Sequence, residues 1–224
     1  MEPLHPIQRE IMRLMTLHAS PRYSDIKPED VDGNLFMYHL NELMKDGYII
    51  KTDKQYGLTI KGRRHAGIIS VDTGLPRLQP KIVVMIYAKN TAGEYLLFRW
   101  KRQPFMNTVS LPYGKTWFGE PIQKMAEREL AMKTGLNGML AHIGDAYVKT
   151  SVGSEIISHM LVHIFSLSDW SGTAASEVPT GDCFWAKIEN IPPEDQAPGF
   201  LEIVAAIETS KEPGFFKEIE TVWH

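Results

Sequence analysis

The chain has 224 residues, a formal net charge of -3, 43% hydrophobic residues and 23% charged residues. These are ordinary globular values, so they exclude a low-complexity disordered chain and a collagen-like chain. No apolar run approaches the roughly 20 residues that a membrane-spanning helix needs, so we expect no membrane partner. The sequence starts without a basic segment followed by an apolar stretch, and its single cysteine, Cys183, cannot form an intrachain disulfide. We therefore expect a cytoplasmic protein.

The first third of the chain has the pattern of a small helical domain that ends in a hairpin. The expected elements, in chain order, are a helix from Pro6, a short helix over 24–31, a helix from Asn34 to about Lys45, and strands over 48–51 and 56–60. Turn residues then gather around Asp72-Thr73-Gly74 and Pro76, which predicts a linker over 69–80. We expect two domains, 1–68 and 81–224.

Residues 38–49 and 56–63 resemble two parts of a winged helix-turn-helix domain, the recognition helix running into the first wing strand, and the returning wing strand. The resemblance implies binding of duplex DNA, with the exposed side of the helix in the major groove and the basic wing near phosphates. The expected DNA contacts are Asn34, Tyr38, Asn41, Lys45, Lys51, Lys54, Lys61 and Arg63. The first 66 residues carry only 10 basic against 9 acidic residues, so dimerisation or protein contact is the alternative use of this domain.

The second part of the chain alternates strands and helices, which predicts an α+β fold or a layered α/β/α sandwich. Gly119-Glu120-Pro121 opens its central helix, which ends at Thr134-Gly135, because proline suits the first turn and glycine the stop. The other expected elements are strands over 81–89, 95–100, 139–150, 155–167 and 183–187 and a last helix over 197–209.

Around the central helix, the spacing of residues resembles the box of the Nudix hydrolase family. The matching residues are Gly114, Glu120 after five residues, Arg128-Glu129-Leu130 after seven more, and Gly135-Leu136 at the end. The resemblance implies a Nudix-like α/β/α sandwich, in which family glutamates hold the divalent cations that bridge a diphosphate. This chain has Met132 and Lys133 where the family has its Glu-Glu pair.

Helical geometry adds a prediction about this substitution. At about 100° per residue, Glu129 and Lys133 both fall in the apolar arc of the helix, four residues apart, so we expect them to form an ion pair. A thioether and an ammonium group do not suit Mg²⁺ or Mn²⁺, so we expect no metal and no cofactor. Other acids, Glu120 and Glu127 with Glu177 or Asp182, leave open a metal site by another route.

Ligand binding can persist without hydrolysis. Arg99, Arg102 and Lys115 are candidates for phosphate contacts, and Tyr113 is a candidate for stacking on a base. The candidate catalytic residues of the box are Glu120, Arg128, Glu129 and Lys133.

Three functions remain open. The first is a homodimeric regulator in which a non-catalytic Nudix-like domain senses a small nucleotide-type ligand and controls the DNA-binding domain. The second is a Nudix hydrolase that uses Mg²⁺ or Mn²⁺, with the first domain serving dimerisation or substrate choice. The third is a scaffold with neither activity.

Overall fold

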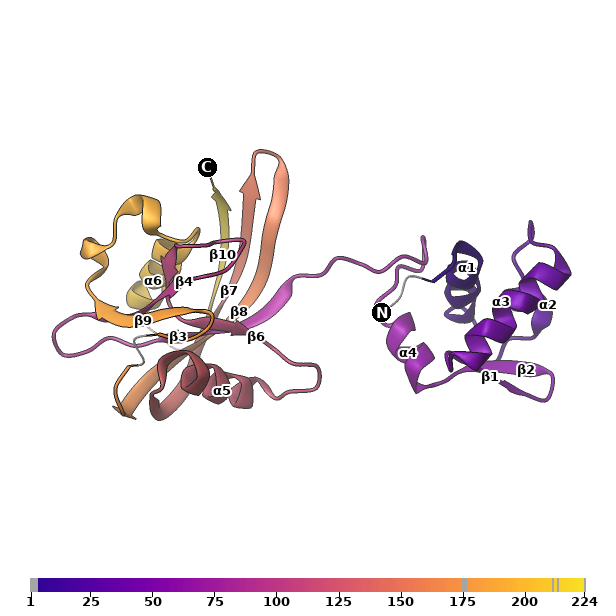
Figure 1. Cartoon of the computed structure of the whole chain (residues 1–224), viewed down its shortest axis with the longest axis horizontal. Coiled ribbons are helices and arrows are strands. Elements are labelled where there is room, and N and C mark those ends of the chain that lie inside the picture. Colours follow the sequence, from indigo (N-terminus) through magenta and orange to yellow (C-terminus); the bar gives the residue numbers. More distant parts are fainter. Residues whose placement is uncertain (1–3, 175–176, 211, 213, 224) are drawn as a thin grey trace. The chain divides into compact units, whose positions relative to one another are not determined.

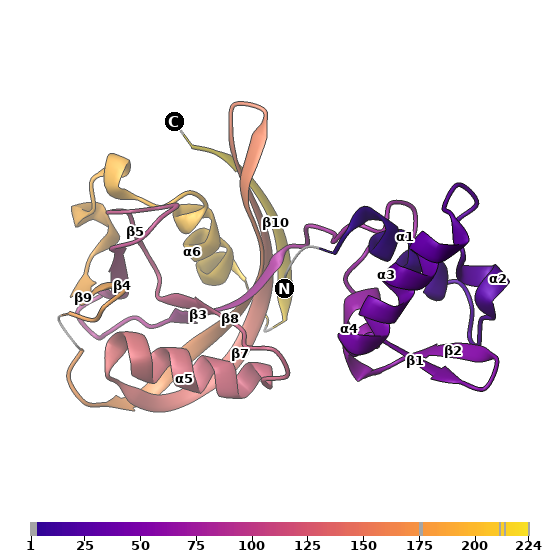
Figure 2. The ribbon, with the colours of Figure 1, turned by 45° about the vertical axis from the view of Figure 1, so that its right-hand side comes forward.

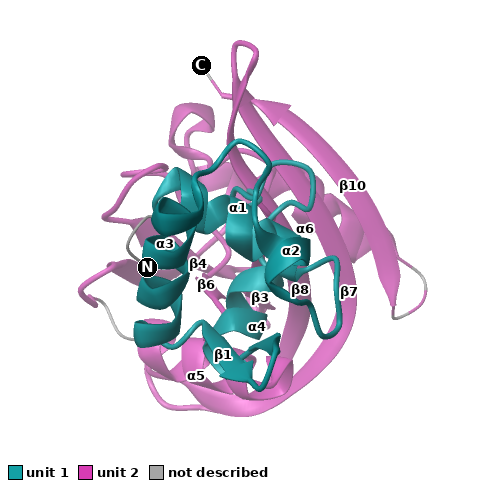
Figure 3. Cartoon of the chain, turned by 90° about the vertical axis from the view of Figure 1, so that its right-hand side faces the viewer, with its two compact units in different colours: residues 1–78 teal, residues 79–224 magenta. Residues whose placement is uncertain are grey.

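The computed structural model describes residues 4–174, 177–210, 212 and 214–223, and the chain forms two compact units, Met1–Leu78 and Gln79–His224 (Figure 3). The elements of the first unit are α1 (Pro6–Met15), α2 (Tyr23–Ile26), α3 (Gly33–Lys45), β1 (Ile49–Thr52), β2 (Gln55–Leu58) and α4 (Ile60–Ala66) (Figure 1). Their apolar side chains form one core, which includes Ile11, Met12, Ile26, Phe36, Leu40, Leu43 and Tyr56. The helices and the antiparallel β1–β2 pair occur in the expected order, and the winged-helix assignment stays a prediction.

Two local features of the first unit differ from the sequence-based expectation. The second helix is only the four-residue α2. The returning strand ends at Leu58, because the Thr59 hydroxyl accepts a hydrogen bond from the Gly62 backbone N–H at 3.1 Å and starts α4. A wing strand over 56–63 was therefore wrong, and Lys61 and Arg63 lie on this helix rather than on the hairpin.

The expected linker also differs from what the structure shows. Ile69 is buried in the core of the first unit and forms an isolated bridge with Pro76. The Arg77 backbone N–H donates to the Ile68 carbonyl at 2.8 Å, and the Arg13 guanidinium donates to the Val71 carbonyl at 3.3 Å. Most of 69–80 is thus a folded turn of the first unit, whose boundary with the second lies after Leu78.

The second unit contains a five-stranded mixed sheet and a three-stranded antiparallel sheet. Its strands are β3 (Lys81–Tyr87), β4 (Tyr95–Trp100), β5 (Val109–Ser110), β6 (Tyr113–Lys115), β7 (Asn137–Val152), β8 (Glu155–Ser171), β9 (Gly181–Ala186) and β10 (Phe215–Val222). One sheet has the order β10-β7-β8-β3-β6 and the other β5-β4-β9. In the larger sheet β3 pairs in parallel with β8, and β10 pairs in parallel with β7. The sequence did not predict β10.

Helices cover both faces of this arrangement. Helix α5 (Ile122–Thr134) packs on Val84 and Ile86, whereas α6 (Phe200–Thr209) packs on Val83 and Met85, the alternate residues of the same strand. The two helices accordingly lie on opposite sides of β3 (Figure 2). Two short 3-10 helices, Ile188–Asn190 and Pro193–Asp195, precede α6. The layers agree with the expected α/β/α arrangement. Within the described residues, no helix is long and apolar enough to span a membrane.

Candidate functional site

The candidate site is built where β6 meets α5. Gly114 in β6 leaves space for the Glu129 side chain, because a Cβ atom at Gly114 would lie 1.8 Å from the carboxyl carbon of Glu129. Helix α5 follows Pro121 and stops at Gly135, whose φ of 68° is in the left-handed region that favours glycine. These local features fix where the carboxylate of Glu129 lies.

Arg128 joins the groups around the start of α5. Its Nε and one terminal nitrogen each donate to a carboxylate oxygen of Glu120 at 2.7 Å, and its other terminal nitrogen donates to Glu129. It also donates to the Lys115 carbonyl at 3.1 Å and lies 3.9 Å from the centre of the Trp117 ring. The hydrogen bond from Arg128 holds the pKa of Glu120 below its usual value. The sequence did not reveal this network.

Lys133 occupies the other side of the Glu129 carboxylate. Its Nζ lies 3.4 Å from Glu129 Oε2, and only 6% of the Lys133 side chain and 8% of the Glu129 side chain are exposed. The rings of Trp100 and Phe98 lie 5.0 and 5.2 Å from the same ammonium. Burial lowers the pKa of Lys133, and the charge of Glu129 opposes that shift. The predicted ion pair is confirmed.

The acids suggested as an alternative metal site are also paired within the chain. Glu127 pairs with Lys124 at 2.7 Å. Glu177 and Asp182 both pair with Lys101, at 2.7 and 2.8 Å. Mg²⁺ and Mn²⁺ require hard oxygen ligands, but both oxygens of Glu129 face cationic groups of the chain and Met132 offers sulfur. The residues present do not fit Mg²⁺ or Mn²⁺ at the box.

Two pockets adjoin this cluster and share Arg102 and Lys115. We call them together the basic cleft. The first is lined by Lys81, Trp100, Arg102, Gln103, Pro104, Phe105, Tyr113, Lys115, Ser158 and Met160. The second is lined by Arg102, Gly114, Lys115, Thr116, Trp117, Arg128, Glu129, Met132, Lys133, Val178, Pro179 and Thr180. Their shared residues are cationic, so the cleft favours an anionic ligand.

The aromatic floor of the basic cleft is formed by two neighbouring rings. The Trp100 and Tyr113 ring centres lie 4.2 Å apart, and the Arg102 guanidinium lies 5.3 Å from the Trp100 ring. Burial raises the pKa of Tyr113 to about 12, so its hydroxyl stays neutral at physiological pH. Lys81 also lines the cleft, and burial together with the charge of Lys115 lowers its pKa. These features join positive charge to an aromatic surface.

The structure brings together three of the four residues expected to bind ligand. Arg102, Tyr113 and Lys115 line the basic cleft. Arg99 does not line it, because its guanidinium donates to Asp195 at 2.9 Å and to the Asn107 carbonyl at 2.8 Å. Sequence reasoning missed Lys81 and Trp100. Side chains alternate between the two faces of a strand, so the positions of Lys81 in β3 and Trp100 in β4 could have shown which face each residue lies on.

The predicted DNA-binding residues are all exposed, but they differ in their contacts within the first unit. Asn34, Tyr38, Asn41 and Lys45 are all exposed along α3, and Lys51 and Lys54 are exposed on the hairpin. Lys61 instead donates to the Asp46 carbonyl at 2.7 Å, at the end of α3, and lies 4.1 Å from the Tyr48 ring. Its ammonium therefore has a structural role within the first unit. Arg63 is exposed on α4.

No protein-family model and no curated protein match this chain. Solved structures do. A MutT mutator protein from Bacillus halodurans is 20% identical, with a TM-score of 0.49, covering 61% of this chain and 89% of its own. A MutT Nudix hydrolase from Burkholderia pseudomallei is 20% identical, with a TM-score of 0.47, covering 59% and 100%. The Nudix domain of Shewanella oneidensis NrtR, solved with ADP ribose, is 13% identical, with a TM-score of 0.42, covering 58% and 86%. These similarities assign no activity or ligand to this chain.

Proposed function

We propose that this protein is a ligand-responsive regulator. Its second unit is a non-catalytic Nudix-like domain that binds a small nucleotide-type ligand, and its first unit is a winged-helix domain that binds duplex DNA as a homodimer. The observation that carries the proposal is the state of Glu129, the carboxylate of the box that faces β6. Lys133 and Arg128 neutralise it from two sides, at the place where a catalytic site would need a metal ion.

The basic cleft supplies what a diphosphate needs in place of a metal. Arg102 and Lys115 neutralise phosphate charge directly, and an arginine fork can hold two phosphate oxygens at once. Tyr113 supplies a partly accessible ring next to these charges, on which a base can stack, and the buried Trp100 ring packs beside it. Binding of this kind requires no divalent cation, so cleavage is not coupled to it.

Calorimetric titration of the full chain with ADP-ribose, a nucleoside diphosphate compound, tests the ligand half of the proposal. We expect saturable binding that is equally tight in EDTA and in Mg²⁺, and that weakens as salt is raised. Arg102→Ala and Lys115→Ala should each weaken it by about tenfold or more, because a charge-assisted hydrogen bond contributes about 1.5–3 kcal/mol. Lys124→Ala is the matched control, because Lys124 lies on α5, pairs with Glu127 and does not line the cleft. Binding that needs Mg²⁺, or that is the same in all three variants, contradicts the proposal.

The first unit supports the regulatory half by the distribution of its exposed side chains. Asn41 and Lys45 are exposed on α3, and Lys51 and Lys54 are exposed on the hairpin that follows it. The helix thus offers an amide group for base contacts, and both elements offer cationic groups for phosphate contacts. Selection from random duplex DNA should enrich a site, and light scattering should give a dimer mass. If no DNA is selected and the mass is that of a monomer, the first unit has another use.

A further inference from the structure

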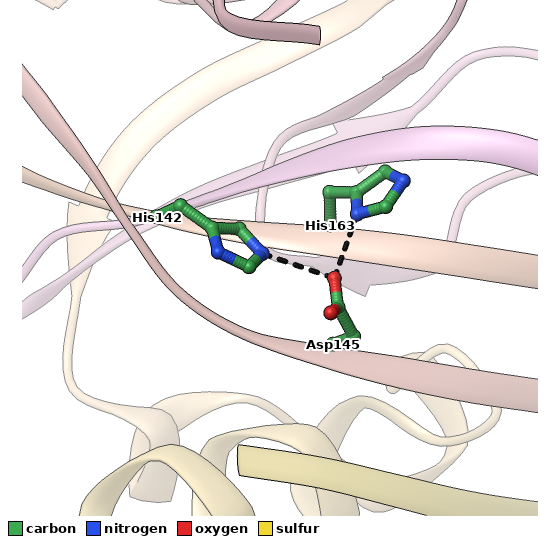
Figure 4. Close-up of side chains that lie close together, drawn as sticks. All are labelled: His142, Asp145 and His163. Atoms are coloured by element: carbon green, nitrogen blue, oxygen red, sulfur yellow. Dashed lines mark hydrogen bonds and ion pairs between the residues drawn. The ribbon is translucent and has the colours of Figure 1, made fainter. Parts of the chain in front are cut away.

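Three polar side chains converge on the larger sheet of the second unit. His142 and Asp145 belong to β7 and His163 to β8, and both imidazole rings point to the same carboxylate (Figure 4). His142 Nε2 lies 3.0 Å and His163 Nδ1 lies 2.7 Å from Asp145 Oδ1. The side chains are 41%, 31% and 23% exposed for His142, Asp145 and His163, so the cluster is open to solvent. We call it the histidine–aspartate cluster.

An irregularity in the β7–β8 pairing creates the cluster. Asp145 lies directly opposite His163, so these two residues share a face of the sheet. Residues three apart in a regular strand point to opposite faces, and His142 would then point away from Asp145. The register shift between His142 and Gly144 adds one residue and reverses this alternation. His142 therefore joins the other two residues on one face.

The surroundings hold this arrangement in place. The centres of the His142 and Phe165 rings lie 5.4 Å apart, with an angle of 62° between the ring planes, and Phe165 is buried in the core beneath α5. Gly144, which directly precedes Asp145, leaves space for the ring of Phe215, because a Cβ atom at Gly144 would lie 2.4 Å from that ring. Strand pairing and this packing thus position the cluster, with no contribution from a loop.

We propose that His142, Asp145 and His163 form a binding site for a divalent first-row transition metal ion of the Zn²⁺ type. Two imidazole nitrogens and one carboxylate oxygen are ligands that suit such ions, whereas Mg²⁺ and Ca²⁺ prefer oxygen alone. The candidate ligand atoms lie within 4.8 Å of one another. Ligands of a tetrahedral zinc ion lie about 3.3–3.5 Å apart at bond lengths of about 2.0–2.1 Å, so no separation between the candidate ligand atoms has to close by more than about 1.5 Å.

Metal binding at this cluster has a definite structural consequence. The ion replaces the protons that the two rings now share with Asp145 Oδ1. Water completes its coordination, because three ligands converge here among the residues that the structure describes. It links β7 to β8 at the register shift, where the backbone pairing is irregular. Because the unfolded chain does not bring the three residues together, binding stabilises the folded second unit.

The test uses the full chain without a histidine tag, after removal of metals with a chelator. Titration with Zn²⁺ should show one saturable site, Co²⁺ should give the visible absorption of a nitrogen- and oxygen-ligated ion, and Mg²⁺ should not compete. His142→Ala, Asp145→Asn and His163→Ala should each weaken Zn²⁺ binding by about tenfold or more, since the histidine changes each remove a ligand and Asp145→Asn replaces the anionic ligand with a neutral one. His18→Ala is the matched control, because His18 is an exposed histidine of the first unit.

The variants are chosen so that loss of Zn²⁺ binding can be distinguished from loss of folding. Asp145→Asn preserves the shape of the side chain, and His142 is the most exposed of the three residues, so the variants that change them should fold. Zn²⁺ should raise the Tm of the parent and of His18→Ala, and it should leave the Tm of His142→Ala almost unchanged. A parent that shows no saturable Zn²⁺ site, or one whose affinity is the same in all variants, overturns the proposal. The cluster is then a hydrogen-bonded triad only.

Discussion

Restoring carboxylates to the box should exchange an internal ion pair for a metal site. The double change Met132→Glu and Lys133→Glu places two new carboxylates three and four residues after Glu129, on the same side of α5. The Met132 side chain is exposed at 59%, whereas Lys133 is buried, so the second change carries most of the energetic effect. The parent pair has its charges 3.4 Å apart.

The magnitude follows from that distance. Two unit charges 3.4 Å apart interact by about 5 kcal/mol at an effective dielectric constant of about 20, and the double variant replaces this attraction with repulsion. Arg128 still neutralises part of Glu129. We therefore expect the metal-free variant to lose about 3–5 kcal/mol, the range for breaking a buried pair. Its Tm should fall by on the order of 10 °C.

Thermal unfolding with and without Mn²⁺, together with calorimetric titration, measures both effects. Added Mn²⁺ should recover much of the lost stability by mass action, and the variant should bind Mn²⁺ more tightly than the parent. Met132→Glu alone is the control, and it should change stability little because the residue is exposed. A metal-free double variant as stable as the parent, with no gain in Mn²⁺ affinity, would refute the reasoning about Lys133.

Further predictions concern both units. Lys51→Glu with Lys54→Glu should weaken binding to every duplex and reduce its salt dependence by about two charges, and Asn41→Ala should mainly relax sequence selectivity, as gel shifts can measure. The pKa of Lys133 is lower in the folded than in the unfolded chain, so the unfolded state binds more protons as pH approaches 10.5. The unfolding free energy of the parent relative to Lys133→Met should therefore rise with pH there; a fall would contradict this assignment. Burial raises the pKa of the Cys183 thiol to about 12, so thiol reagents should label it slowly until denaturant is added, and fast labelling of the folded chain would contradict its burial.

Local patterns explain what could be predicted. The spacing of the box, a proline before it and a glycine after it define α5, and helical periodicity alone places Glu129 and Lys133 on its inner face. The same periodicity identifies the exposed side of α3. These features depend on residues a few positions apart, so they can be worked out without knowing the fold.

The missed features depend on distant residues or on single irregularities. Strand β10 was missed because its place is set by pairing with β7, far earlier in the chain. Arg99 was predicted to bind the ligand, but it pairs with Asp195, which lies 96 residues away in the sequence. One added residue in β7 brings His142 to the face of Asp145, and strict alternation hides such a pair.

Product analysis of the parent protein with ADP-ribose and Mn²⁺ tests the central claim most directly. The protein should bind the compound but release no nucleoside monophosphate above the protein-free control, because Lys133 and Arg128 occupy the surroundings of Glu129. Metal-dependent release of product that disappears in Glu129→Gln would contradict the claim and identify the second unit as a hydrolase.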